Sequence, residues 1–150
     1  MGNIFNQDFQ DFIQSLNKFE VEYILVGGYA VILRGYSRTT GDMDIWVNKT
    51  EENYKKLFKA FSFFGLSISD MTKENFLQNK DFDVFSYGRP PVSIDIMTAI
   101  KGLIFEQAFE NKEIYDFEGF PINLISKQDL IVAKKASNRF KDINDIEHLK

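Results

Sequence analysis

The chain has 150 residues, of which 44% are hydrophobic, and a formal net charge of −4. This length is common for one domain, and the apolar content, with sixteen Phe residues, excludes a disordered chain. The absence of cysteine excludes disulfides, thiolate zinc sites and cysteine nucleophiles, and the single histidine, His148, leaves a multi-histidine metal site without ligands. We expect one domain over residues 1–150, with His148 solvated near the chain end.

Charge and hydropathy also restrict location and partners. The longest apolar run, residues 24–33, is interrupted by Gly27 and Gly28 and is far too short to span a membrane. The chain does not open on an export signal, so we expect a cytoplasmic protein with no membrane partner. The negative net charge disfavours tight binding of nucleic acid but allows a nucleotide to be held by a few local groups.

The first half of the chain alternates helix-like and strand-like patterns. Apolar side chains at helical spacing predict a first helix over about residues 9–19, after the capping candidates Asn6 and Asp8. The other predicted elements are a buried strand over 21–26 that ends in a turn at Gly27-Gly28, a short helix over 29–33, a polar loop over 35–41, a strand over 42–47, and a helix from Thr50 to Gly65.

The second half continues in irregular order. Its predicted elements are a short helix near 74–78, a strand over 83–86, a strand over 92–97 after Pro90-Pro91, a helix over 103–109, a hairpin of 114–117 with 120–125, a helix capped by Ser126, and a last helix over about 142–149. This irregular alternation favours an α+β fold over a doubly wound sheet.

An Asp followed two positions later by Asp or Glu occurs four times, and most such pairs are expected to be solvated charge. The four pairs are Asp42/Asp44, Asp81/Asp83, Asp116/Glu118 and Asp145/Glu147.

The pair Asp42/Asp44 differs because it alternates with the apolar Met43, Ile45 and Val47. A strand there puts both carboxylates on one face with their Cα atoms about 6.5–7 Å apart, close enough to share one cation. Two like charges on a half-buried strand are costly, and a bound Mg²⁺ is the simplest compensation. The alternative is a pair of exposed carboxylates on a solvated sheet face.

Two further features fit the same chemistry. Asp95 lies between Ile94 and Ile96 on another predicted strand, so three carboxylates would meet if the two strands were neighbours. Gly27-Gly28 follows an apolar strand, where glycines let the backbone approach a phosphate at a helix start, although a tight structural turn explains them equally well.

In this order, these pieces resemble the nucleotidyltransferase superfamily. The matching segments are Ile24-Leu25-Val26-Gly27-Gly28, Asp42-Met43-Asp44-Ile45 and Ile94-Asp95-Ile96. Residues 26–47 are similar to the small bacterial branch that also holds AbiEii-type toxins and antibiotic nucleotidyltransferases. The segment 125–149 is similar to the one that closes many such proteins, except that Phe140 stands where a Pro is usual. The resemblance implies a mixed β-sheet flanked by helices.

The resemblance also implies roles for individual residues. Asp42, Asp44 and Asp95 would be the catalytic carboxylates and Mg²⁺ ligands, with Asp95 holding a second metal or taking a proton from the acceptor. The implied nucleotide-binding residues are Gly27, Gly28, Arg38 and Lys134. Tyr29 and Trp46 are more simply explained as core, and Lys141, Asp142 and Asp145 as local helix contacts.

The implied activity is Mg²⁺-dependent transfer of a nucleoside monophosphate from a nucleotide triphosphate to a hydroxyl acceptor, which could be a small molecule, an RNA or a protein. One alternative is a catalytically silent protein of the same fold that acts as a binding or toxin–antitoxin partner. A metal-dependent phosphodiesterase or nuclease is a second alternative, which the negative charge disfavours. A homodimer or a partner protein could complete the pocket.

Overall fold

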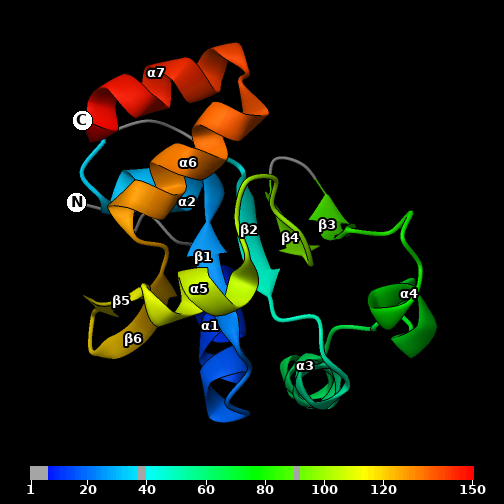
Figure 1. Ribbon diagram of the computed structural model, residues 1–150. Helices are drawn as coiled ribbons and strands as arrows, with labels where there is room; N and C mark the ends of the chain where they lie inside the picture. The colour runs from blue at the N-terminus through cyan, green and yellow to red at the C-terminus, as the bar shows by residue number, and fades with distance from the viewer. Residues whose placement is uncertain (1–6, 37–39, 90–91) are drawn as a thin grey trace.

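The computed structural model describes residues 7–36, 40–89 and 92–150 (Figure 1). In these ranges the strands form one six-stranded sheet in the order β3-β4-β2-β1-β6-β5. The strands are β1 Tyr23–Val26, β2 Asp42–Val47, β3 Val84–Arg89, β4 Val92–Met97, β5 Glu113–Phe117 and β6 Phe120–Leu124. The pairs β1–β6 and β2–β4 are parallel and the other neighbouring pairs are antiparallel, so the predicted mixed sheet is confirmed.

Helices lie on both faces of the sheet and at one end of it (Figure 1). They are α1 Gln7–Lys18, α2 Gly27–Leu33, α3 Glu51–Phe64, α4 Lys73–Leu77, α5 Phe105–Glu110, α6 Lys127–Ser137 and α7 Phe140–Leu149. Helices α6 and α7 lie at the end of the sheet where β1 ends and β2 begins.

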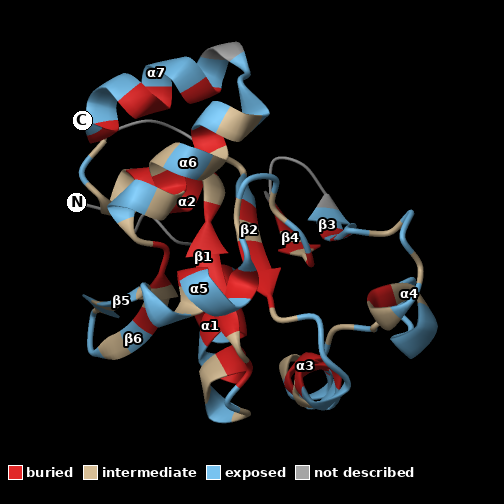
Figure 2. Ribbon diagram, in the orientation of Figure 1, coloured by how far each residue is buried: buried red, intermediate tan, exposed pale blue. Residues whose placement is uncertain are grey.

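The two faces of the sheet have different contents because side chains alternate along each strand. On one face, Met43 and Ile94 lie in one register row with Tyr87, whose ring packs on Phe61 of α3 at 5.0 Å between centroids. On the other face, Trp46 packs on Phe105 of α5 at 5.2 Å. Figure 2 shows the buried residues concentrated along β1, β2 and β4. The face with Trp46 is the one that carries Asp42 and Asp44.

Local sequence signals account for several element boundaries. Thr50 caps α3 by accepting a hydrogen bond from the Asn53 amide, and Gly65 ends that helix in the left-handed conformation. Ser126 caps α6 in the same way, through the Asp129 amide. The prediction of a separate turn at Gly27-Gly28 is wrong, because helix α2 already begins at Gly27. The chain reverses at Gly27 itself, whose positive φ of 69° replaces a longer turn.

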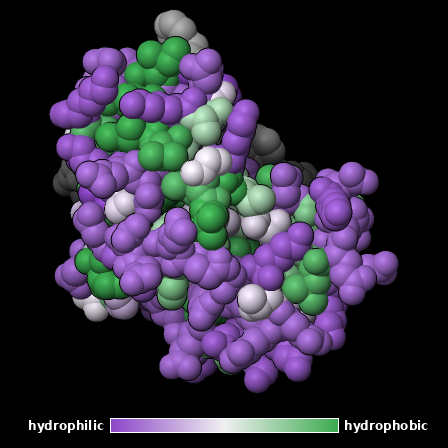
Figure 3. Space-filling view, viewed as in Figure 1, coloured by the Kyte–Doolittle hydropathy of each residue, from purple (hydrophilic) through white to green (hydrophobic). Residues whose placement is uncertain are grey.

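The face of the molecule seen in Figure 3 is mainly hydrophilic, with several hydrophobic areas, some of them over α6 and α7. Among the large apolar side chains, Val132 of α6 and Ile143 of α7 are exposed. No helix in the described ranges is long and apolar enough to cross a bilayer.

Candidate active site

Strands β2 and β4 bring the three predicted carboxylates to one face of the sheet. In their parallel register, Asp42 lies beside Ser93 and Asp44 lies beside Asp95. Residues paired across neighbouring strands point to the same face, so these four side chains form a two-by-two block. The predicted meeting of the three carboxylates required the strand of Asp95 to lie beside the strand of Asp44. The structure meets this condition.

The block concentrates negative charge at Asp44. Burial, together with the negative charges of Asp95 and Asp42, raises the pKa of Asp44 to about 7, against the opposing effect of Lys134. A hydrogen bond between the side chains of Asp44 and Asp95 also favours the protonated form. Asp44 is thus a carboxyl group whose charge is poorly compensated by the protein itself.

Gly27 lies directly against Asp44 at the start of α2. A Cβ atom at Gly27 would lie 2.1 Å from Oδ2 of Asp44, so any side chain there would displace the carboxylate. Val26, which precedes the helix, offers no side-chain cap to the first-turn amides. The glycine is therefore required for close packing on the acid, and the uncapped start of α2 faces the acidic block.

A second group of charges lies beside the first, where α6 packs on α7. Lys134 is 6% exposed, and its Nζ atom lies 3.2 Å from Oδ1 of Asp142 and 3.1 Å from Oδ2 of Asp145. Arg139 holds Asp142 as well, with its Nε atom 2.8 Å from Oδ2. Burial raises the pKa of Asp142, but the hydrogen bonds from Arg139 and Lys134 outweigh burial and lower it to about 2.

A small cavity of about 100 Å³ joins the two groups of charges. Its walls combine ionisable and apolar side chains, namely Val26, Gly27, Asp44, Met97, Ile100, Leu130, Ala133, Lys134, Ser137 and Arg139. The predicted nucleotide-binding residues Gly27 and Lys134 therefore lie in the same cavity as the predicted catalytic residue Asp44.

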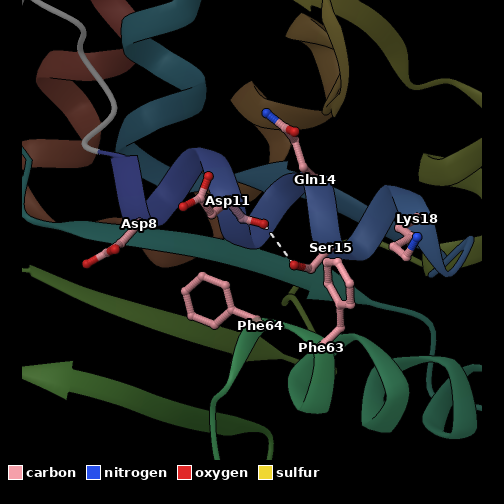
Figure 4. Close-up of a pocket in the computed structure, with 7 residues that line it drawn as sticks. All are labelled: Asp8, Asp11, Gln14, Ser15, Lys18, Phe63 and Phe64. Carbon is pink, nitrogen blue, oxygen red and sulfur yellow. Dashed lines mark hydrogen bonds between the residues drawn. The ribbon is translucent and has the colours of Figure 1, made fainter.

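A larger concavity of about 520 Å³ lies elsewhere, between α1 and α3 (Figure 4). Its carboxylates, Asp8 and Asp11, are exposed, and the Nζ atom of Lys18 lies 5.0 Å from the centre of the Phe63 ring. Figure 4 shows Ser15 donating to the Asp11 carbonyl one turn earlier in α1, at 2.8 Å. Its charged groups are all exposed to solvent, so volume alone does not select the functional site.

The donor set fits Mg²⁺, which prefers carboxylate oxygens. The raised pKa of Asp44 reflects negative charge that a cation would relieve. Within the described residues, no three acidic, histidine or cysteine side chains are already gathered as a metal cage. The acids instead form an open arrangement in which Asp44 and Asp95 adjoin and Asp42 accepts a hydrogen bond from Ser93.

The other predicted residues have mixed outcomes. Arg38 lies outside the described residues. Tyr29 and Trp46 are buried core residues, as expected. His148 is exposed, but its ring stacks on Tyr36 at 3.6 Å between centroids, so it is not simply solvated.

Most residues of the four acidic pairs are exposed, as expected. Asp145 is the clear exception, at 1% exposed, because it pairs with Lys134 across the α6–α7 contact. Sequence reasoning also assigned no role to Ser93, and it did not select Arg139 as a site residue. Ser93 could have been found from its place opposite Asp42 in an alternating strand, and Arg139 from its position three residues before Asp142.

Comparison with known protein families identifies the family of this chain. Residues 6–150 match the family described as nucleotidyltransferase of unknown function (DUF6036). The chain belongs to this family. The recognition of a nucleotidyltransferase, made from the glycine and aspartate motifs, is therefore confirmed. Among curated proteins, none is significantly similar to this family member in sequence.

Solved structures confirm the fold. The lincosamide antibiotic adenylyltransferase LnuA, in its lincomycin-bound crystal structure, aligns with a TM-score of 0.60 and 16% identity over 99% of this chain and 98% of LnuA. The antibiotic-resistance factor ANT(2'')-Ia, in a solution structure, aligns with a TM-score of 0.55 and 14% identity over 95% of this chain and 80% of that protein. This member of the nucleotidyltransferase family thus has the architecture of two antibiotic-related proteins.

Proposed function

We propose that this protein transfers a nucleoside monophosphate from a nucleotide triphosphate to a hydroxyl acceptor, with Mg²⁺ as cofactor. The observation that carries the proposal is the pairing of Asp44 with Asp95 on neighbouring strands, directly against Gly27 at the start of a helix. Carboxylates, an uncapped helix start and a cavity meet at one place, which is the combination that phosphoryl chemistry needs.

Asp42, Asp44 and Asp95 would hold the metal through their carboxylate oxygens. When bound, Mg²⁺ neutralises charge on the reacting phosphate and aligns the attacking and leaving oxygens. The site suits this role because Asp44 is strongly disfavoured as an uncompensated anion. The same residue would be a poor choice for a purely structural carboxylate.

The backbone around the cavity would bind the triphosphate. The Gly27 and Gly28 amides begin α2 without a side-chain cap, so they can donate to phosphate oxygens. Lys134 and Arg139 line the cavity, but their charges are already balanced by Asp142 and Asp145. They would therefore orient the phosphates by directed hydrogen bonds and add little net positive charge.

The transfer step would exchange one bond at the α-phosphorus for another. The acceptor hydroxyl oxygen bonds to the α-phosphorus, the bond from that phosphorus to the bridging oxygen of the β-phosphate breaks, and pyrophosphate leaves. The hydroxyl proton passes to the carboxylate of Asp95. Holding the acceptor oxygen in line with the leaving oxygen is the main contribution expected of the site.

The acceptor stays open among small molecules, RNA and proteins. The structural likeness to an adenylyltransferase bound to lincomycin makes small antibiotics the first acceptors to test. A cytoplasmic location suits a nucleotide triphosphate donor and stays a prediction. The catalytically silent reading, in which the fold serves a binding or toxin–antitoxin partner, is retained as an outcome of the experiment.

Thermal unfolding with each nucleotide triphosphate, with and without Mg²⁺, tests the proposal without knowledge of the acceptor. A ligand at a hundred times its dissociation constant stabilises a fold by about 2.7 kcal/mol, which at this size raises Tm by roughly 5–10 °C. We expect this rise for the wild type, and we expect it to disappear in the double variant Asp42→Asn, Asp44→Asn. The variant Asp81→Asn, Asp83→Asn is the matched control, because these exposed acids have the same spacing away from the site.

Two results would overturn the proposal. One is a folded wild-type protein that no triphosphate stabilises with Mg²⁺, which would favour the silent binding reading. The other is an equal Tm rise in the wild type and in the double variant, which would place any nucleotide site elsewhere on the molecule.

A further inference from the structure

Ser93 is the one uncharged member of the two-by-two block. It lies beside Asp42 in the β2–β4 register, is 8% exposed, and its Oγ atom donates to Oδ1 of Asp42 at 2.5 Å. Its backbone amide also donates to the Gly41 carbonyl at 3.3 Å, which fixes the strand pair at the same point. The backbone that carries the hydroxyl group is therefore fixed beside Asp42.

Asp42 needs such a partner more than the other two acids. It is exposed at the first position of β2, whereas Asp44 and Asp95 are partly buried and contact each other. An exposed carboxylate samples several rotamers in solution, and binding a cation would require it to lose that freedom. A short hydrogen bond to one carboxylate oxygen selects one rotamer and leaves the other oxygen available to a cation.

We propose that Ser93 is a positioning residue for the cation site, which acts by fixing the carboxylate of Asp42. This inference rests on the proposed function, because it assumes that Asp42 binds a cation there. Ser93 would not touch the metal or the substrate. Removing a hydrogen-bond partner of a metal ligand typically weakens metal affinity by about 10- to 100-fold, and the hydroxyl group of Ser93 is expected to act in that range.

Titration of the nucleotide-free protein with Mg²⁺ alone, followed by calorimetry and by Tm, tests the inference. We expect Ser93→Ala to raise the dissociation constant by about tenfold or more. Ser93→Thr retains the hydroxyl group on a β-branched residue suited to a strand, so it should restore most of the affinity. Ser86→Ala is the matched control. It removes an exposed hydroxyl from β3, opposite Asp95, where no hydrogen bond from Ser86 to either carboxylate is present in the described structure.

The outcomes separate this inference from the proposed function. If the wild type and Ser86→Ala bind Mg²⁺ and Ser93→Ala binds it equally well or more tightly, the positioning role is wrong while the proposed function stands. If the wild type binds no Mg²⁺ in the absence of nucleotide, the inference fails, while the proposed function is decided separately by the Mg²⁺-dependent response to triphosphates. A Ser93→Thr variant as weak as Ser93→Ala would also overturn the inference, provided that all variants unfold with the cooperative transition of the wild type.

Discussion

Two groups of carboxylates have opposite electrostatic environments, one lining the small cavity through Asp44 and the other pairing with Lys134 and Arg139 of its wall. Asp142 and Asp145 are buried, but two cations of the same chain hold them, and the pKa of Asp142 falls to about 2. Asp44 has mainly other acids for neighbours, and its pKa rises to about 7. The first group has its compensation within the fold. The second lacks it, which is consistent with the cation site that we propose.

The largest expected effect comes from removing the internal cation. Lys134→Met would leave Asp142 and Asp145 buried with only Arg139 on one of them, and breaking such a buried pair costs about 3–5 kcal/mol. Urea denaturation should show that loss, and Tm should fall by roughly 10 °C. Lys135→Met, at the exposed neighbouring position, should stay within about 0.5 kcal/mol of the wild type. A cost below about 1 kcal/mol for Lys134→Met would contradict the assignment of compensated charge.

The next largest effect is the dependence of the free energy of unfolding on pH, which has opposite signs for Asp44 and Asp142. The pKa of Asp44 is raised by folding, so its contribution to stability is complete below the unfolded value of 3.8 and is lost as pH rises through about 7. The pKa of Asp142 is lowered by folding, so its contribution is present above 3.8 and is lost as pH falls through about 2. Between pH 5 and 8, only the Asp44 term changes.

Without divalent metal, Asp44→Asn should therefore remove most of the fall in unfolding free energy between pH 5 and 8. That fall is up to about 3 kcal/mol, because about 1.4 kcal/mol is lost for each pH unit between 5 and the folded-state pKa of about 7. The variant should be more stable than the wild type at pH 8 in EDTA and yet lose the Mg²⁺-dependent nucleotide response. If the unfolding free energies of the wild type and Asp44→Asn changed equally with pH, the acidic block would not destabilise the ionised form of Asp44.

The smallest expected effect concerns the close contact between Gly27 and the carboxylate of Asp44. Gly27→Ala and Gly65→Ala both place a side chain at positive φ, but only the Cβ atom at Gly27 meets another group, the carboxylate of Asp44. Backbone strain of about 1 kcal/mol is expected for Gly65→Ala, and about 1–2 kcal/mol more for Gly27→Ala. The Mg²⁺ response should be lost only in Gly27→Ala. Equal costs with the response intact in both would show that Asp44 can move aside freely.

The sequence predicted the parts of this site that depend on neighbouring residues and missed those that depend on contacts between distant elements. The bounds of β2 and β4 and the facing of Asp42 and Asp44 were predictable because strand alternation is local. The pairing of Lys134 with Asp145 was not, because it depends on how α6 packs on α7. A buried acid and a solvated acid look alike in sequence, so the pair Asp145/Glu147 could not be separated from exposed pairs such as Asp81/Asp83.

The hydrogen bond from Ser93 to Asp42 was missed for a related reason. The prediction brought Asp95 to the other two acids only if the strands were neighbours, and it included no register. Once the register is known, the partner of Asp42 follows directly. The register itself is set by the alternation of Ile94 and Ile96 with polar residues and by the helices that pack on the sheet.

The three carboxylates meet only when β2 and β4 pair in the observed parallel register, so the site is either complete or absent. A slip of β4 by one residue would turn Asp95 to the opposite face and bring Ile94 or Ile96 beside Asp44. The two acids are separated by about fifty residues of chain, so no local segment can assemble them by itself. A molecule with misregistered strands would be inert rather than altered in specificity, and the fraction of competent sites in a preparation should report directly on the fraction of correctly assembled sheets.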